Sequence, residues 1–183
     1  MKTYKYLFIA FTFLFLAGGF SSMAKNEPPT KQFVVVLDAG HGGKDSGNSW
    51  HGFYEKHIAL DIALKVGKEL EKNKNIKVIY TRKTDVFIPL HKRADIANEA
   101  EADLFVSVHC NGHDSNAHGT ETFVLGLHRS KDNLEVAMKE NSVIYLEDDY
   151  KVSYGNFDPK DPSSYIGMTL MQEEYLDQSI LLA

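Results

Sequence analysis

Two histidines and a glutamate stand where the chain could hold a metal ion. His41 lies in the glycine-rich segment 38–43, Glu55 follows it by 14 residues, and His109 follows Glu55 by 54. Two imidazoles and one carboxylate form a three-ligand zinc set that leaves a coordination position open for water. Zinc held in this way lowers the pKa of its bound water towards ~7 and polarises a carbonyl group, which is the chemistry of amide hydrolysis.

The spacing of these three residues is not that of a local metal-binding motif, so only the fold can bring them together. A single histidine in a loop is more often a surface residue than a ligand. The location of His41 directly after an expected buried strand favours the ligand interpretation. The other histidines are interpreted as structural or solvent-facing: His51, His57, His91, His113, His118 and His128.

A phosphate-binding loop is the competing interpretation of residues 38–47, and the sequence does not fit it. The dinucleotide pattern requires a third glycine where Asp45 stands. The mononucleotide pattern requires glycine at the position of Asp38 and serine or threonine at that of Asp45. Because a carboxylate there would repel phosphate, the sequence disfavours nucleotide binding.

Alternating strands and helices are expected to position the three residues. Residues 33–37 form a continuous apolar run rich in β-branched residues, typical of a strand buried on both faces. Further strands are expected at 76–80, 103–108 and 120–125. The pattern predicts a single α/β domain in which a twisted, mostly parallel sheet carries helices on both faces. In such folds functional groups collect at the carboxyl ends of the strands, where His41 and His109 would lie.

Helices are expected between these strands and after the last of them. One is predicted because four apolar residues recur at every fourth position, namely Ile58, Ile62, Val66 and Leu70. A second is expected at 90–101, with Ile96 and Ala100 on its inner face. After Gly126 the pattern weakens: 134–150 has helical stretches, and a last helix is expected from Ser163 or Ser164. That helix shows no stop signal, so we expect the sequence to be a fragment.

Residues 1–24 are predicted to be a signal peptide. Lys2 and Lys5 precede an apolar run, and the small residues of 22–24 suit a signal peptidase. The run reaches 14 residues at most, short of the ~20 that cross a bilayer. No cysteine follows it, so no lipoprotein anchor is expected. We expect export to the periplasm or the extracellular envelope, a polar tether at 25–32 and the folded domain at 33–183.

Composition narrows the classes of partner. The chain has 183 residues, of which 43% are hydrophobic and 25% charged, with a formal net charge of −5. These values fit one globular domain. Proteins that bind nucleic acid usually show a basic excess, so no nucleic-acid partner is expected. One cysteine cannot form an intramolecular disulfide, so stability must come from a core or a metal.

Several motifs within residues 33–126 together resemble the zinc-dependent N-acetylmuramoyl-L-alanine amidases of the bacterial cell wall. They are Val36–Gly43, Tyr54-Glu55-Lys56, Thr81-Arg82 with Asp85, Arg93-Ala94 with Ala97-Asn98, Ser107–Asn111 and Gly119–Thr122. The resemblance implies zinc on His41, Glu55 and His109. It also implies peptidoglycan as the substrate and cleavage of the amide between N-acetylmuramic acid and L-alanine, in wall turnover or daughter-cell separation.

The sequence departs from the family pattern in one serious respect. The resemblance implies a second glutamate, the general acid/base, on a late strand like Val-Leu-Val-Glu followed by Gly-Phe, and this sequence has no such segment. Glu121 is a weak substitute, and Glu173 and Glu174 are interpreted as the exposed face of the last helix. We therefore expect a chain that holds most of the zinc site but loses about 10²–10⁴-fold in rate without the proton-transfer group. Two minor departures are Ser46, where proline is frequent, and Cys110, interpreted as a buried small hydrophobe.

Other residues are assigned to substrate and regulation. Arg82 and Asn111 are weak candidates for substrate binding, although an ion pair with Asp85 would also explain Arg82. Some members of the family carry an insertion, here 127–165, that shields the zinc until an activator protein moves it. A carboxylate from this segment could then take the open metal position, and the candidates are Glu135, Glu140, Glu147, Asp148 and Asp149. A solvated acidic surface is the alternative interpretation.

Two alternatives to the amidase remain. One is a non-catalytic, zinc-bearing module that binds peptidoglycan or a partner protein and does not need the late glutamate. The other is a zinc peptidase that acts within the stem peptide.

Overall fold

A computed structural model describes residues 31–112, 118–124, 131–165 and 176–183, with the side chains of 131–133 excepted. The expected signal peptide and nearly all of the tether lie outside these ranges. None of the helices in the described ranges is both long and apolar enough to cross a membrane.

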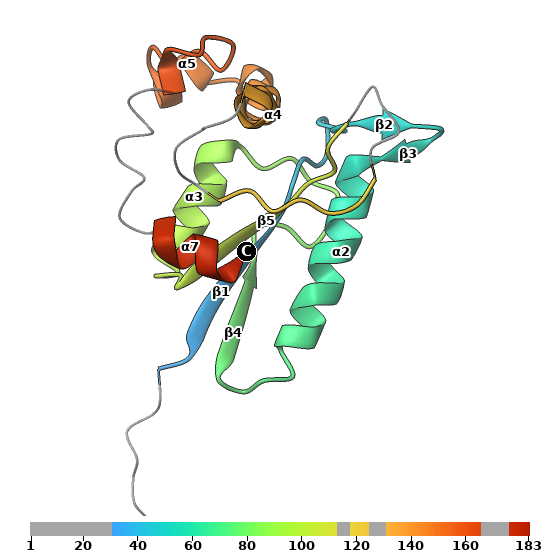
Figure 1. The fold of residues 1–183 in the computed structure, drawn as a ribbon, viewed down its shortest axis with the longest axis vertical. Coiled ribbons are helices and arrows are strands. Elements are labelled where there is room, and N and C mark those ends of the chain that lie inside the picture. Colours follow the sequence, from blue (N-terminus) through green and yellow to red (C-terminus); the bar gives the residue numbers. More distant parts are fainter. Residues whose placement is uncertain (1–30, 113–117, 125–130, 166–175) are drawn as a thin grey trace, which may run out of the picture. The chain divides into compact units, whose positions relative to one another are not determined.

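A three-stranded parallel sheet forms the centre of the domain (Figure 1). Strand β1 (Phe33–Ala39) lies between β4 (Ile76–Tyr80) and β5 (Leu104–Val108). Val35 of β1 is in register with Val78 on one side and Leu104 on the other. Every β1 residue after Phe33 is buried, which confirms the strand predicted from the apolar run.

Helices cover the two faces of this sheet (Figure 1). Helix α2 (Glu55–Leu70) packs against all three strands, and α3 (Leu90–Glu99) packs against β1. The strand order explains this arrangement. The chain moves outward from β1 to β4 and then back across β1 to β5, and right-handed crossovers in opposite directions place their helices on opposite faces. The predicted α/β class is therefore confirmed.

Helix α2 meets the sheet through small side chains and not through its large apolar ones. Ala59 and Ala63 are fully buried, whereas Ile58 and Ile62 are about 40% exposed. A Cβ atom at Gly67 would collide with the ring and hydroxyl of Tyr80. The four-residue periodicity thus predicted the helix correctly, but close approach to the strands requires alanine and glycine on the inner face.

A short hairpin connects the loop after β1 to α2. Strands β2 (Ser49–Trp50) and β3 (Phe53–Tyr54) are antiparallel. The two residues between them, His51 and Gly52, have φ angles of 48° and 84°. Two positive φ values define a type I′ turn, whose twist matches that of the flanking strands.

The segment after residue 118 differs in part from the expectation. Residues 120–124 are irregular and mostly exposed, so the strand predicted at 120–125 is wrong over the described part. This segment does not pair with the described sheet. The Glu121 side chain accepts a hydrogen bond from the Asn111 amide. Helix α4 (Lys131–Asn141), the 3₁₀ helix η1 (Ser142–Leu146) and α5 (Tyr150–Tyr154) follow.

The last helix falls only partly within the description. Helix α7 covers Leu176–Leu182. Residues 164 and 165 are helical, which agrees with the expected start at Ser163 or Ser164, and residues 166–175 lie outside the described ranges.

A buried carboxylate ties the carboxyl ends of the strands together. Oδ1 of Asp38 accepts hydrogen bonds from Arg93 of α3 and from Thr81 after β4, and Oδ2 accepts one from Ser107 of β5, each 2.6 Å long. Burial alone would raise the pKa of Asp38, but the Arg93 charge and these hydrogen bonds hold it below its usual value. The ionised Asp38 side chain therefore stabilises the end of the sheet from which the segments carrying His41 and His109 begin.

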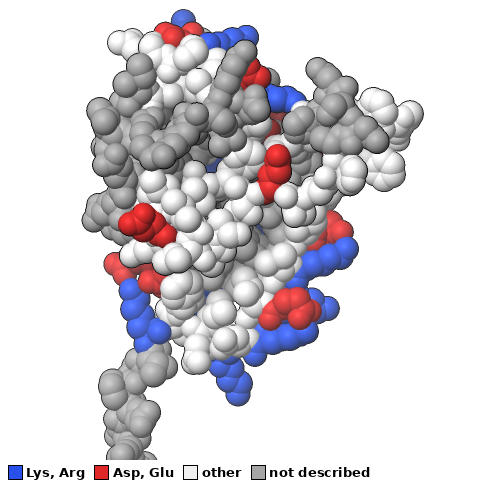
Figure 2. All heavy atoms as spheres, in the orientation of Figure 1, with Lys and Arg blue, Asp and Glu red and all other residues white. Residues whose placement is uncertain are grey.

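Charged side chains of both signs lie along the outer side of α2 (Figure 2). Lys65 pairs with Asp61 one turn away, and Lys72 pairs with Glu69, at 2.6 Å in each case. These exposed pairs contribute little stability, on the order of 0.3–0.5 kcal/mol each.

Candidate metal centre

The loop after β1 brings His41 to the carboxyl end of the sheet in a conformation that depends on two glycines. His41 itself has φ of +58°, a value that residues other than glycine rarely adopt. A Cβ on Gly40 would lie 2.5 Å from the His109 ring. A Cβ on Gly47 would lie 2.6 Å from His41 and 2.7 Å from the Glu55 carboxylate. Glycine at both positions lets the loop close around the three side chains.

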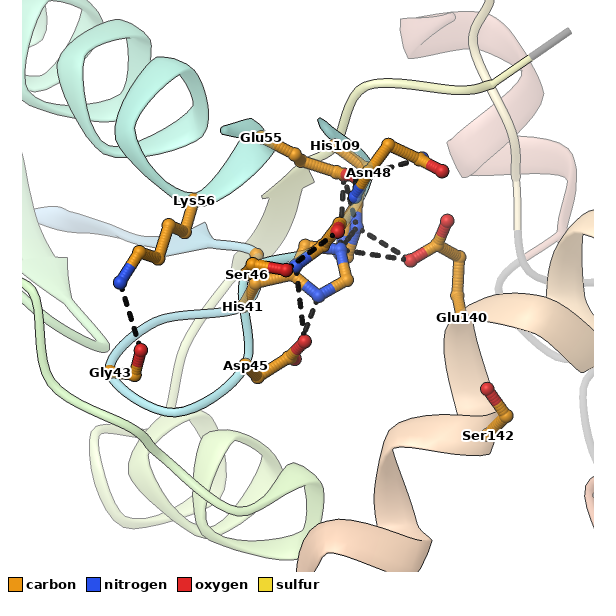
Figure 3. Close-up of polar contacts among 12 residues, drawn as sticks. His41, Gly43, Asp45, Ser46, Asn48, Glu55, Lys56, His109, Glu140 and Ser142 are labelled. Carbon is orange, nitrogen blue, oxygen red and sulfur yellow. Dashed lines mark hydrogen bonds and ion pairs between the residues drawn. The ribbon is translucent and has the colours of Figure 1, made fainter. Parts of the chain in front are cut away.

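Four side chains converge at this point (Figure 3). His41, Glu55 and His109 come from the β1 loop, the first residue of α2 and the residue after β5, as their predicted positions imply. The fourth is Glu140 of α4, which points toward the two imidazoles (Figure 3). One ligand atom from each residue lies within 4.8 Å of all the others.

The separations within the group resemble the edges of a tetrahedron. His41 Nε2 lies 3.1 Å from Glu55 Oε1 and 3.2 Å from Glu140 Oε2. His109 Nδ1 lies 3.2 Å from Glu55 Oε1, 3.0 Å from Glu140 Oε2 and 3.2 Å from His41 Nε2. Ligands bonded at ~2.1 Å to a tetrahedral ion are roughly 3.4 Å apart. Five of the six edges are thus close to the size that a small divalent ion requires.

One atom of the group lacks the hydrogen bond that its burial demands. Glu140 Oε2 is buried and makes no hydrogen bond among the described residues, although two histidine nitrogens lie within 3.2 Å. The oxygen is close to both nitrogens but is not aligned with them for a hydrogen bond. Such a geometry is expected when all three atoms point toward a common metal position. Together with the donor types, this orphaned oxygen indicates that the residues fit a metal ion.

Without a metal, protons balance the charges of the group. Burial alone would lower the pKa of His41, but the nearby carboxylates of Asp45, Glu140 and Glu55 raise it to about 11. Burial opposes protonation of His109 as well, yet Glu140 and Glu55 raise its pKa to about 9. Against the effect of burial, the two histidines lower the pKa of Glu55 and bring that of Glu140 to about 2. When no cation is bound, these shifts favour protonated imidazoles beside ionised carboxylates.

Two side chains and one backbone amide from outside the ligand group hold it in place. Asp45 contacts His41 Nδ1 at 2.7 Å, which leaves Nε2 to face the centre. Asn48 donates from its backbone N and its side-chain Nδ2 to Glu55 Oε2, at 2.8 and 2.9 Å. The backbone N of Cys110 donates to Glu55 Oε1 at 2.7 Å.

The sequence analysis did not identify the supporting roles of the Asp45 and Asn48 side chains. A signal for Asp45 existed, since a carboxylate close to a ligand histidine is the usual second partner of its ring. Asn48 had no signal of that kind, because its contact with Glu55 depends on the hairpin turn between them.

The candidate substrate residues lie in other surroundings. Arg82 is 3% exposed, and its guanidinium donates to backbone carbonyls of Ala39, Gly40, Lys56 and Thr84. Its contacts support the loop that carries His41. Asp85, the partner suggested for Arg82, instead accepts hydrogen bonds from Lys56 and from the Gly43 backbone at 2.7 Å. Asn111 and Glu121 are exposed and bind each other at 2.8 Å.

The five acidic candidates of segment 127–165 separate into different environments. Glu140 joins the metal centre, and the Glu147 side chain is 1% exposed. Glu135 and Asp149 are exposed, and the Asp148 side chain is fully so. A solvated acidic surface therefore describes part of the segment but not Glu140 or Glu147.

A cavity of about 300 Å³ lies beside the ligand group. The β1 loop and the start of the hairpin line it with His41, Asp45 and Asn48, and the opposite wall includes Lys139 and Ser142. Lys139 also donates to Asn48 Oδ1 at 2.6 Å. Segment 131–146 thus contributes a wall of the cavity as well as a ligand.

The parallel sheet and the convergent histidines and glutamates define an α/β domain with a candidate metal centre at the carboxyl ends of its strands. Residues 35–183 match the N-acetylmuramoyl-L-alanine amidase family, and the chain belongs to that family. The resemblance drawn from the motifs is confirmed.

Individual relatives are similar over shorter stretches. The endolysin of Bacillus phage SPP1 is 54% identical over 78 residues, which is 43% of this chain and 29% of the relative. N-acetylmuramoyl-L-alanine amidase AmiA of Escherichia coli K12 is 45% identical over 94 residues, 50% of this chain and 32% of the relative. The catalytic domain of CwlV, an amidase from Bacillus (Paenibacillus) polymyxa var. colistinus, is 40% identical with a TM-score of 0.48, covering 57% of this chain and 59% of that one. The chain thus spans about a third or less of the two curated relatives.

Proposed function

We propose that this chain is a zinc-dependent hydrolase that cleaves the amide between N-acetylmuramic acid and L-alanine in peptidoglycan. The observation that carries the proposal is the convergence of His41, Glu55, His109 and Glu140 with near-tetrahedral separations. Membership of the amidase family supplies the substrate class. Zinc is the metal proposed because two imidazoles and a carboxylate at these distances match its preferred ligands and coordination number.

The residues of the chain prepare the site before substrate arrives. Zinc bound by His41, Glu55 and His109 would supply polarisation of the amide carbonyl and activation of a water molecule. Asp45 fixes which nitrogen of His41 faces the centre. Asn48 and the Cys110 backbone fix both oxygens of Glu55, so that its carboxylate does not need to reorient during the reaction.

Glu140 makes the described arrangement a closed one. Structural zinc sites are surrounded by four protein ligands, whereas catalytic sites keep one position open. Because Glu140 takes the fourth corner, we infer that it must withdraw before water and the substrate carbonyl can reach the metal. An activator protein that moves segment 127–165 would have this effect, as expected from the family resemblance.

Glu121 stays a weak candidate for proton transfer, since the late glutamate that the family resemblance implies has no counterpart in this sequence. The Glu121 carboxylate is exposed and accepts a hydrogen bond from the Asn111 side chain. A Glu121→Gln variant that binds zinc but has lost hydrolysis would support this role. Unchanged hydrolysis by that variant would exclude it.

We propose that the protein acts in the bacterial envelope, in wall turnover or daughter-cell separation. The support is the signal-like composition of residues 1–24 and the cell-wall chemistry named for its relatives. Retention of residues 1–24 on a protein that stays inside the cell would contradict this location.

Mass spectrometry of the products from purified peptidoglycan tests the activity. The zinc-loaded chain is compared with Glu140→Ala, in which the fourth corner is empty, and with Glu55→Ala, which lacks a ligand. Release of stem peptides that begin at L-alanine, increased by Glu140→Ala and absent in Glu55→Ala, supports the amidase. Cleavage within the stem peptide indicates a peptidase. Binding without release from either zinc-loaded protein leaves two interpretations, a binding module or an amidase that lacks its general acid/base.

A further inference from the structure

The β2–β3 hairpin carries aromatic side chains that the metal centre does not use. Trp50 is 75% exposed and Phe53 is 67% exposed. Within the described ranges these are the two most exposed residues among phenylalanine, tyrosine and tryptophan. Large aromatic side chains are mostly buried in folded proteins, and a group of exposed ones marks a binding surface.

The hairpin holds the two rings in a defined arrangement. Trp50 and Phe53 are direct partners across the antiparallel pair, so their side chains leave the same face of the ribbon. The type I′ turn at His51 and Gly52 fixes the register between them. The His51 ring contacts the Trp50 ring edge-on, with centroids 4.5 Å apart and planes at 89°. The two aromatic rings are thus pre-organised in the absence of a ligand.

The hairpin segment that carries the pair is polar and has few charged groups. Residues 46–54 contain no Lys, Arg, Asp or Glu, and the Ser49 hydroxyl lies next to Trp50 in the sequence. Figure 2 shows no charged side chain at the projecting tip of the β2–β3 ribbon. A sugar ring fits this chemistry, since its C–H face packs on aromatic rings while its hydroxyl and acetamido groups bind neutral donors and acceptors. Anionic lipid would instead call for lysine or arginine.

The hairpin is continuous with the metal centre. Asn48 precedes β2 and Glu55 follows β3, and the Glu55 backbone N donates to the Asn48 carbonyl at 2.9 Å. Two residues of extended chain, about 7 Å, separate Asn48 from Trp50. A glycan bound on the aromatic pair would therefore lie beside the ligand group.

We propose that Trp50 and Phe53 form a subsite for neutral N-acetylated sugar residues of the glycan strand, beside the metal centre. The choice of this sugar rests on the proposed function. The subsite would hold the glycan strand while the attached peptide reaches the metal.

Ligand binding at this subsite can be followed by tryptophan fluorescence. The chain contains one tryptophan, so intrinsic tryptophan fluorescence reports on Trp50 alone. The probe is tetra-N-acetylchitotetraose, an uncharged β-1,4-linked N-acetylglucosamine tetramer without peptide, titrated into the full chain. We expect a saturable change in emission and, for Phe53→Ala, an affinity lower by about tenfold or more. Leu181→Ala is the matched control, since Leu181 is 88% exposed on α7, and its affinity should be unchanged.

Calorimetry with the same tetramer extends the test to Trp50. Trp50→Phe retains an aromatic ring and should weaken binding less than Trp50→Ala. Retained zinc binding by each variant shows that the adjacent centre is still folded.

Three results would overturn the subsite. They are an emission that does not respond to the tetramer, an unchanged affinity of Phe53→Ala, and a blue shift with phosphatidylcholine vesicles but none with the tetramer, which would identify a membrane surface instead. Because the tetramer has no lactyl-alanine amide, failure here is distinguishable from failure of the amidase. If the chain binds the tetramer but releases no stem peptides, the result supports the subsite and contradicts the proposed hydrolysis.

Discussion

Asp45 shows how a residue outside the ligand group controls the metal centre. Its carboxylate contacts His41 Nδ1 and also accepts a hydrogen bond from the Gly47 backbone. The first contact selects the nitrogen that faces the centre, and the second holds the loop in which His41 has a positive φ. One side chain therefore sets both the ring orientation and the backbone that carries it.

Replacement of Asp45 by asparagine should weaken zinc binding about 10–100-fold. The amide keeps an acceptor for the loop but loses the charge that supports the His41 ring. Competition with a chromophoric chelator measures the affinity. Asp61→Asn, which removes an exposed carboxylate on α2, should leave it unchanged. Equal affinities for Asp45→Asn and the parent chain would contradict the role given to Asp45.

The metal-free protein should be most stable between about pH 4.5 and 6.5. The pKa values of His41 and His109 rise from 6.5 to about 11 and about 9 on folding. Their contribution is complete below pH 6.5 and is lost as the pH rises toward these folded-state values. Glu140, lowered from 4.5 to about 2, contributes fully above pH 4.5 and loses its contribution as the pH falls toward 2.

Thermal unfolding in the presence of a chelator checks this pH window. The melting temperature should fall between pH 6.5 and 9 and again between pH 4.5 and 2. Glu140→Gln removes one of the charges that favour both imidazolium ions, so its alkaline decline should be smaller. A melting temperature that is flat from pH 6.5 to 9 would show that protons do not replace the metal in this group.

At the scale of elements, α4 contributes the fourth side chain of the candidate metal centre. Glu140→Ala should open a coordination position that an external anion can take. We expect azide to change the visible spectrum of the Co²⁺-loaded variant and to leave that of the parent chain unchanged. Glu135→Ala lies on the same helix at an exposed position and should behave like the parent. Azide binding to the Co²⁺-loaded parent chain would mean that Glu140 does not occupy the fourth position.

Glu147, which directly follows η1, connects this part of the chain to the start of α3. No side chain from the residue before α3 caps the helix, and Glu147 Oε1 accepts the Leu90 backbone N–H at 2.7 Å instead. The same carboxylate contacts the Tyr154 hydroxyl at 3.0 Å and the His91 ring at 3.2 Å. A carboxylate at a helix N-terminus satisfies free N–H groups and complements the helix dipole.

Glu147→Ala should therefore lower the free energy of unfolding by about 1–3 kcal/mol, because buried donors lose their acceptor. Urea denaturation followed by far-UV circular dichroism measures the change. The neighbouring Asp148→Ala removes a fully exposed carboxylate and should cost less than about 0.5 kcal/mol. Similar losses for the two variants would contradict the cap.

The elements that could be predicted from sequence are those with a strong local pattern. Strand β1 follows from an unbroken apolar run, and β4 and α3 were expected nearly at their observed bounds. Residues 120–124 have strand-like composition but no neighbouring strand in the described sheet, and propensity alone does not create a strand. The inner face of α2 also escaped prediction, because its closeness to β4 depends on the contact between Gly67 and Tyr80.

The whole molecule explains why the candidate site was only partly predictable. His41 and His109 follow strands that end at the same edge of the sheet, and Glu55 opens the next helix, so topology alone brings them together. Glu140 was one of five acidic candidates named in segment 127–165, with no periodic pattern to single it out. Its selection requires the path of α4 across the β1 loop, which is a tertiary feature.

Because the ligand group joins four separate segments, metal binding should stabilise the whole fold. Zinc at about 1,000 times its dissociation constant adds ~4 kcal/mol to the free energy of unfolding. For a domain of this size that corresponds to a rise in melting temperature of roughly 8–16 °C. Differential scanning calorimetry with and without zinc measures it, and Glu55→Ala should show almost none of the rise. An equal rise in Glu55→Ala would place the stabilising ion elsewhere, whereas a rise confined to the parent chain ties global stability to the group formed by the β1 loop, α2, β5 and α4.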